Sequence, residues 1–211
     1  MKIDATFIRS AASASDLPQD DLDELAVVGR SNVGKSSLIN ALLRQRLART
    51  SAAPGKTRLA NIFRVKRGAR PPFHLVDLPG YGYARGGVAS ARAFDELTRA
   101  YFQRERPGQI AALLLVDARH PGLPADIEAW NWLRQTVARC GIVATKIDKL
   151  ARGERIRAMR QLESVFETSV LPVSADTGEG LDELWRMIDR PANNPAEPAP
   201  RPRLPKKPQR K

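Results

Sequence analysis

The sequence predicts an α/β domain in which a mostly parallel six-stranded sheet carries helices on both faces, giving three layers. Apolar strand-like runs alternate along the chain with segments of helical periodicity, and several of these runs are apolar enough to be buried on both faces. In an open sheet of this type, ligands bind beyond the carboxyl ends of the strands. Functional residues are therefore expected in the loops that follow the strands.

The predicted elements follow one another in a regular order. The six strands are expected at residues 24–29, 61–67, 73–78, 110–117, 141–148 and 170–174. Helical periodicity covers residues 35–46, 91–104, 125–138, 153–166 and 181–188.

The chain of 211 residues suits one folded domain with shorter segments at its ends. We expect an N-terminal strand and an acidic linker at residues 1–23 and the folded domain at residues 24–190. Residues 191–211 are rich in Pro, Lys and Arg and predict a disordered basic tail, because such a composition cannot bury a core.

The sequence predicts no secretory signal, no membrane-spanning helix and no internal disulfide. The N-terminus lacks the apolar stretch of a secretory signal, and no apolar run approaches the roughly 20 residues that a membrane-spanning helix needs. The single cysteine, Cys140, cannot form an internal disulfide. We therefore expect a cytoplasmic protein without a membrane anchor, and a monomer in the absence of any sign of a dimer.

The net charge of +12 is unevenly distributed. Residues 25–76 contain eleven Lys or Arg and no Asp or Glu, and the tail adds a further basic cluster. A solvated basic face would explain such a segment, but its length favours a polyanionic partner, with RNA ahead of lipid headgroups.

The stretch GRSNVGKS at residues 29–36 fits the pattern G-x-x-x-x-G-K-[ST] of a phosphate-binding loop. It follows an apolar strand and opens a helix, which is the context that the motif requires. The glycines let successive main-chain N–H groups face one anion, and the helix adds the positive end of its dipole. Lys35 is expected on the β- and γ-phosphates, Ser36 on Mg²⁺ and Ser37 near the α-phosphate. The residues expected in this loop are Gly29, Arg30, Ser31, Asn32, Val33, Gly34, Lys35, Ser36 and Ser37.

The residues that would recognise the nucleotide base are predicted at the end of a later strand. Thr145-Lys146-Ile147-Asp148 matches the [NT]KxD pattern of guanine recognition. The Asp148 carboxylate can accept hydrogen bonds from guanine N1–H and its 2-amino group together, whereas adenine offers neither donor. A main-chain N–H near Ser174 and Ala175 could meet guanine O6. The residues expected at the base are Thr145, Lys146, Ile147, Asp148, Val173, Ser174 and Ala175.

Two loops are expected to sense the γ-phosphate. Asp77 ends a strand and is placed to hold Mg²⁺ through water, and the N–H of Gly80 would bond the γ-phosphate. Thr57, in a Pro- and Gly-containing stretch, is the expected second hydroxyl ligand of Mg²⁺. The residues expected at the nucleotide are Pro54, Gly55, Lys56, Thr57, Asp77, Leu78, Pro79 and Gly80.

With these loops in order, the chain resembles the translation-factor class of P-loop GTPases, and more narrowly the EngB (YihA/YsxC) family of small bacterial GTPases. The narrower resemblance rests on GRSNVGKSSLINAL, PGKTRLANIF, DLPGYGYA, LLLVDARHPGLPAD, TKIDKL and PVSADTGEGLDEL, which spread over nearly all of residues 24–188. It implies a six-stranded GTPase domain, Mg²⁺-dependent GTP hydrolysis, a role in assembling the large ribosomal subunit and, in some members, normal septum formation. The basic tail lies outside the resemblance.

One position bears on the hydrolysis rate. Many regulatory GTPases carry a water-orienting glutamine directly after the glycine that corresponds to Gly80, and Tyr81 stands here instead. Intrinsic hydrolysis is therefore expected to be slow. In related families an asparagine at the position of Asn32 helps hold K⁺ beside the phosphates, and Asn32 is therefore counted with Lys35, Thr57 and Gly80 among the expected catalytic residues. The alternative is that Asn32 only shapes the loop, because asparagine tolerates unusual backbone angles.

Three functions remain open at this point. The first is a GTP-controlled assembly factor that binds ribosomal RNA or a precursor of the large subunit. The second is a small-molecule kinase, against which the TKID and DxxG loops argue. The third is a GTP-dependent adaptor for a protein of the division machinery.

Overall fold

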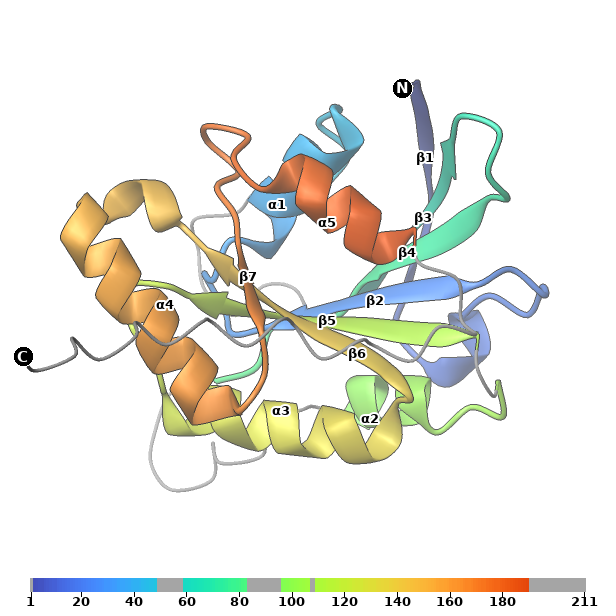
Figure 1. Cartoon of the computed structure of the whole chain (residues 1–211). Helices are drawn as coiled ribbons and strands as arrows, with labels where there is room; N and C mark the ends of the chain where they lie inside the picture. Colours follow the sequence, from blue (N-terminus) through green and yellow to red (C-terminus); the bar gives the residue numbers. More distant parts are fainter. Residues whose placement is uncertain (1, 49–58, 83–95, 107–108, 190–211) are drawn as a thin grey trace, which may run out of the picture.

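The computed structural model describes residues 2–48, 59–82, 96–106 and 109–189. In this part of the chain, seven strands form one sheet in the order β1-β3-β4-β2-β5-β6-β7 (Figure 1). The strands are β1 (Ile3–Ala11), β2 (Glu24–Gly29), β3 (Ala60–Arg67), β4 (Phe73–Asp77), β5 (Ile110–Asp117), β6 (Arg139–Thr145) and β7 (Val170–Pro172). Neighbours from β4 to β7 are parallel, whereas β3 is antiparallel to both β1 and β4.

The predicted class, with a mostly parallel sheet, is confirmed, and the described sheet has one strand more than the predicted six. The additional strand is β1, which was expected as an N-terminal strand outside the domain sheet. It joins the sheet because its backbone pairs with β3, from Ile3 opposite Arg67 to Ala11 opposite Ala60. The edge of β3 is thereby covered, and β1 becomes the edge strand.

Helices cover both faces of the sheet (Figure 1). The described helices are α1 (Lys35–Leu43), α2 (Glu96–Phe102), α3 (Pro124–Thr136), α4 (Arg152–Phe166) and α5 (Leu181–Ile188), with 3-10 turns η1 (Ala14–Asp16) and η3 (Ile147–Lys149). Side chains of α1 and α5 pack into one hydrophobic cluster, and side chains of α2, α3 and α4 pack into the other. The sheet lies between these two clusters.

The environment of strand β2 explains why its sequence is apolar from Leu25 to Val28. Leu25 and Val27 lie in the cluster under α1 and α5, while Ala26 and Val28 lie in the cluster on the opposite face. Successive side chains of a strand point to opposite faces, so a strand covered on both sides must be apolar throughout.

Several predicted helices end earlier in the structure: α2 ends at Phe102 rather than at residue 104, and α3 ends at Thr136 rather than at residue 138. Helix α1 ends at Leu43 rather than at residue 46, because Arg44 takes a left-handed conformation with φ of 55° that a continuing helix cannot contain. The predicted start of α2 at residue 91 and the predicted tail at residues 191–211 lie outside the described residues.

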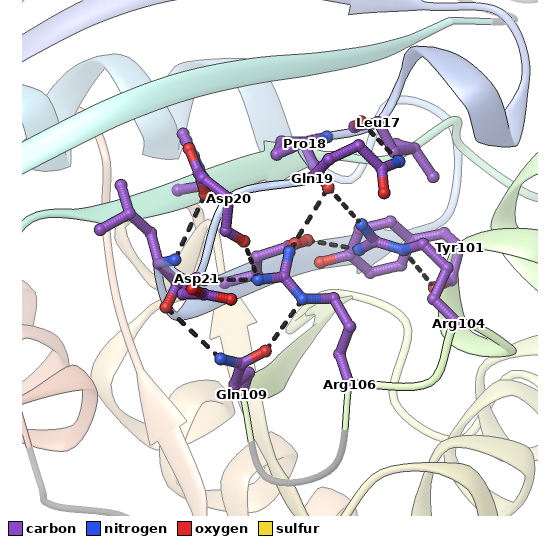
Figure 2. Close-up of polar contacts among 12 residues, drawn as sticks. Leu17, Pro18, Gln19, Asp20, Asp21, Tyr101, Arg104, Arg106 and Gln109 are labelled. Atoms are coloured by element: carbon purple, nitrogen blue, oxygen red, sulfur yellow. Dashed lines mark hydrogen bonds and ion pairs between the residues drawn. The ribbon is translucent and has the colours of Figure 1, made fainter.

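The acidic linker between β1 and β2 is fastened to the segment that follows α2 (Figure 2). The guanidinium groups of Arg104 and Arg106 both donate to the carbonyl of Pro18 and both form ion pairs with the buried carboxylate of Glu24. Arg104 also lies over the ring of Tyr101, with its Cζ 4.4 Å from the ring centroid, within the distance of about 6 Å at which a cation is attracted to an aromatic face. These contacts join the linker that precedes β2 to the segment that precedes β5.

The parallel strands place their following loops on one edge of the sheet. Strands β2, β4, β5 and β6 run in the same direction, so their carboxyl ends meet there. The described helices include none that is long and apolar enough to cross a membrane.

Candidate nucleotide-binding site

The predicted phosphate loop forms a tight turn between β2 and α1. Asn32 has a φ of 64° and Gly34 a φ of 106°, conformations that favour Asn and Gly over most residues. At Gly29 the constraint is space instead, because a Cβ atom there would lie 2.9 Å from the carbonyl oxygen of Leu115 in β5. The loop thus begins where two strands approach closely and ends at the N-terminus of α1.

Lys35 and Asp77 form the charged centre of the site. Asp77, at the end of β4, is 4% exposed, and burial raises the pKa of its carboxyl to about 6, although the positive charge of Lys35 acts in the opposite direction. Burial also lowers the pKa of the Lys35 ammonium, while Asp77 raises it. Two groups of opposite charge, one at the start of α1 and one at the end of β4, therefore interact electrostatically while largely shielded from water.

The residues present fit a magnesium ion. Among the described residues, the buried Oδ1 atom of Asp77 has no hydrogen-bond partner, and a carboxylate oxygen is a ligand type that Mg²⁺ prefers. Ser36 offers its hydroxyl from the first turn of α1. The other predicted ligand, Thr57, lies outside the described residues, as do Pro54, Gly55 and Lys56.

The predicted guanine loop is tied directly to the phosphate loop. The hydroxyl of Thr145 donates to the carbonyl of Val33 over 2.7 Å, and the ammonium of Lys146 donates to the carbonyl of Asn32 over 2.6 Å. The Lys146 stem passes beside Gly34, where a Cβ atom would lie 3.7 Å from Lys146 Cε. Segments more than a hundred residues apart in the sequence are therefore in direct contact.

Asp148 is held in a defined orientation. The hydroxyl of Ser174 donates to Asp148 Oδ1 over 2.7 Å, and Lys149 Nζ lies 2.9 Å from Oδ2. The hydrogen bond from Ser174, followed by that from Lys149, keeps the pKa of the Asp148 carboxyl below its usual value against the effect of burial. The carboxylate is therefore ionised at neutral pH and can accept hydrogen bonds.

The structure narrows the choice of main-chain donor for guanine O6. The N–H of Ser174 already donates to the carbonyl of Glu179 over 2.9 Å, and the N–H of Val173 donates to Ala144 over 2.8 Å. Of the three residues predicted in this loop, Ala175 is the one left as candidate donor. The buried hydroxyl of Ser174 instead orients Asp148.

Asp117, at the end of β5, is a site residue to which the sequence analysis gave no role. Its carboxylate accepts bonds from the main-chain N–H and the guanidinium of Arg119 and from the ammonium of Lys146, 3.0 Å away. Burial alone would raise the pKa of the Asp117 carboxyl, but these donors outweigh it and hold the pKa well below the usual range. The signal in the sequence is an acidic residue that ends a buried strand two positions before an arginine.

The remaining predicted residues lie on the same edge of the sheet. Val33, Leu78 and Ile147 are buried and support the loops, and Gly80 approaches so closely that a Cβ atom would lie 3.2 Å from Lys35 Nζ. Also in this group are Pro79, which is buried, and Arg30, Ser31 and Ser37 of the phosphate loop. The side chain of Tyr81 reaches α3, where its hydroxyl donates to Asp126.

Comparison with known proteins agrees with this geometry. Residues 24–146 match the family model described as "50S ribosome-binding GTPase". Among solved structures, the fold is similar to Aquifex aeolicus Era bound to GDP and aluminium fluoride, with a TM-score of 0.65 and 25% identity over 79% of this chain and 55% of that one. The fold and the site therefore define a P-loop GTPase.

More similar relatives specify the family. The probable GTP-binding protein EngB of Chlorobaculum tepidum is 43% identical over 88% of this chain and 95% of its own length, and that of Pelotomaculum thermopropionicum is 40% identical over 90% and 96%. A crystal structure of a probable GTP-binding protein engB has a TM-score of 0.59 at 25% identity, covering 78% of this chain and 96% of that one. The chain belongs to the EngB family of GTP-binding proteins, as the sequence motifs predicted.

Proposed function

We propose that this chain is a cytoplasmic, monomeric, Mg²⁺-dependent GTPase that hydrolyses GTP slowly and acts as an assembly factor for the large ribosomal subunit, with a contribution to septum formation. The observation that carries the proposal is the match of residues 24–146 to a family described as ribosome-binding GTPases. The acid-free basic segment at residues 25–76, which contains the phosphate loop, supports it, because RNA is a polyanion.

In the proposed complex, the main-chain N–H groups of the phosphate loop surround the phosphates, and Lys35 contacts the β- and γ-phosphates. Asp148 accepts from guanine N1–H and the 2-amino group, Lys146 covers the base plane, and Ala175 donates to O6. Guanine is selected because Ser174 and Lys149 keep the carboxylate of Asp148 oriented and ionised.

Ser36 and Thr57 are the proposed direct ligands of Mg²⁺, and Asp77 holds the ion through water. When bound, the ion neutralises charge that develops on the phosphate oxygens. The N–H of Gly80 is the proposed donor to the γ-phosphate, and Gly80 lies against the phosphate loop, where a Cβ atom would lie 3.1 Å from the main-chain nitrogen of Ser31. Tyr81 contributes no water-orienting amide, and its hydroxyl is occupied by Asp126, so the intrinsic rate is slow.

We further propose that K⁺ assists hydrolysis through Asn32. The exposed side chain of Asn32 leaves its amide oxygen accessible, while its main-chain carbonyl is used by Lys146. The left-handed φ of 64° equally supports the alternative, in which Asn32 only shapes the loop. The variant Asn32→Gly separates the two, because glycine keeps the backbone angle and removes the amide. Turnover is compared in K⁺ and Na⁺ at equal ionic strength; equal rates for the unaltered protein contradict the K⁺ proposal, and a K⁺ stimulation lost in Asn32→Gly supports it.

The ribosomal part is tested by co-sedimentation with purified large and small subunits at near-physiological salt. The protein is loaded with GDP or with a non-hydrolysable GTP analogue, and a variant lacking residues 191–211 measures the contribution of the tail. Small subunits are an informative control, because Era, a protein of similar fold, has been crystallised in complex with nucleotides 1506–1542 of 16S ribosomal RNA. Binding to large subunits that depends on the nucleotide supports the proposal. Absence of binding in both states favours the alternative, an adaptor for a protein of the division machinery.

A further inference from the structure

The segment Gly80–Gly82, directly after Asp77-Leu78-Pro79, is bound to the phosphate loop by its backbone. The N–H of Ser31 donates to the carbonyl of Tyr81 over 3.0 Å, and Arg30 and Tyr81 form a parallel β-bridge. A Cβ atom at Gly80 would lie 3.1 Å from the main-chain nitrogen of Ser31. This segment therefore lies in direct contact with the loop that is expected to bind phosphate.

The side chain of Tyr81 fixes the same segment to helix α3. Tyr81 is 5% exposed, and its hydroxyl donates over 2.7 Å to Oδ1 of Asp126, which is 1% exposed and lies in the first turn of α3. Burial raises the pKa of the Asp126 carboxyl, and the bond from Tyr81 opposes that rise. Because both groups are shielded from water, loss of this hydrogen bond would leave a buried acceptor without its donor.

Arg30 connects this pair to the phosphate loop. Its side chain passes beside Gly82, where a Cβ atom would lie 3.1 Å from Arg30 Cγ. Its positive charge lowers the pKa of both Asp126 and Tyr81, the direction expected for a cation near an acceptor and a phenol. The phosphate loop, the segment Gly80–Gly82 and α3 thus form one connected arrangement.

We propose that the Tyr81–Asp126 hydrogen bond stabilises the position of Gly80–Gly82 that suits GDP, and that Asp126 is a positioning residue that sets the preference between GDP and GTP. Binding of a γ-phosphate requires the loop after Asp77 to present its N–H groups to that phosphate. In the observed arrangement, the backbone of this segment is bonded to the phosphate loop, where the N–H of Ser31 donates to the Tyr81 carbonyl. The side chain of Tyr81 is held on α3 by Asp126. A bond that stabilises one conformation weakens the apparent affinity for any ligand that needs the other.

The experiment measures dissociation constants of the full chain for fluorescent GDP and for a fluorescent non-hydrolysable GTP analogue. The variants are Tyr81→Phe, Asp126→Ala and the double variant, with Asp126→Asn as the conservative replacement, because an asparagine oxygen can still accept the tyrosine hydroxyl. Both disruptive variants are expected to favour the GTP analogue over GDP by about tenfold more than the unaltered protein. The double variant should add little, since both changes remove one bond. Asp126→Asn should remain close to the unaltered protein.

Tyr101→Phe is the matched control, because it removes another buried tyrosine hydroxyl, in α2 at the opposite end of the sheet. It is expected to leave the ratio of the two dissociation constants unchanged. The proposal is overturned if Tyr81→Phe and Asp126→Ala leave that ratio unchanged, or weaken both nucleotides equally, since a merely structural role gives that result. The inference rests on guanine-nucleotide binding by these loops; failure of the unaltered protein to bind either nucleotide would instead remove that basis and the proposed function with it.

Discussion

The buried carboxylate of Glu24 offers the sharpest test of what stabilises this fold. Glu24 is 2% exposed at the start of β2, and it pairs with two guanidinium groups, those of Arg104 and Arg106. The change Glu24→Gln removes the negative charge and nearly preserves the shape. Breaking a buried ion pair from one side costs about 3–5 kcal/mol of unfolding free energy, because the remaining charge stays buried without its partner.

The lower end of that range applies, because glutamine can still accept one hydrogen bond. For a domain of 150–250 residues, 1 kcal/mol corresponds to a shift of about 2–4 °C in Tm, so a loss of about 3 kcal/mol predicts a fall of about 6–12 °C. The assay is thermal and urea unfolding of both proteins under identical conditions. Faster hydrogen exchange in the linker before β2 and in α2 should accompany the fall, since Glu24 and its partners join these segments.

The control is Glu183→Ala, which removes the exposed pair between Glu183 and Arg186 on α5, where N and O are 2.8 Å apart. An exposed pair of this kind contributes roughly 0–1 kcal/mol. If Glu24→Gln lowers Tm no more than Glu183→Ala does, the reasoning from burial is refuted.

Three further predictions follow from the site. Asp148→Asn should weaken GDP binding by about a hundredfold or more and favour xanthosine diphosphate, because an amide can donate to the 2-oxo group of xanthine; titration with both nucleotides checks this. Asp117→Asn should make the free energy of unfolding depend less on pH in the acid range. Because the pKa of Asp117 is lowered in the folded state, the unfolded state binds more protons, so the stabilisation from Asp117 is full above about pH 5 and is lost as pH falls below about 4. Urea unfolding of both proteins at pH 3 and pH 5 measures the difference. Gly29→Ala should destabilise the protein by about 1–3 kcal/mol, because its Cβ would meet the Leu115 carbonyl. Gly153→Ala, at an exposed position in α4 where the added Cβ would lie 3.7 Å from Arg157 Nη1, should stabilise the protein by about 0.5–1 kcal/mol in the same unfolding assay.

Much of the fold was predictable because local pattern and tertiary environment agree. After Glu24 the run ELAVVG contains no charged or polar side chain, and β2 is buried on both faces. Helix boundaries were less predictable: α1 stops at Leu43 because of the left-handed Arg44, which no apolar spacing reveals. The incorporation of β1 into the sheet depends on pairing with β3, some fifty residues further along the chain, and periodicity carries no information about pairing at that distance.

The candidate site divides in the same way. The phosphate and guanine motifs are short and contiguous, so their residue types and order could be read directly, and their meeting at one edge followed from parallel strands. The hydrogen bonds between the two motifs could not be predicted from the sequence. The hydrogen bonds from Lys146 to the carbonyl of Asn32 and to the carboxylate of Asp117 depend on the directions of two side chains and one loop carbonyl once the strands are assembled.

The sequence by itself therefore determined the class of fold, the order of the nucleotide loops and the chemistry each can perform, because these depend on residue type and short-range spacing. Only the tertiary structure decided the pairing of Tyr81 with Asp126, the burial of Glu24 between two arginines and the orientation of Asp148 by Ser174. Each of these contacts joins residues from different elements, and side-chain direction across such distances is set by the packing of the whole sheet.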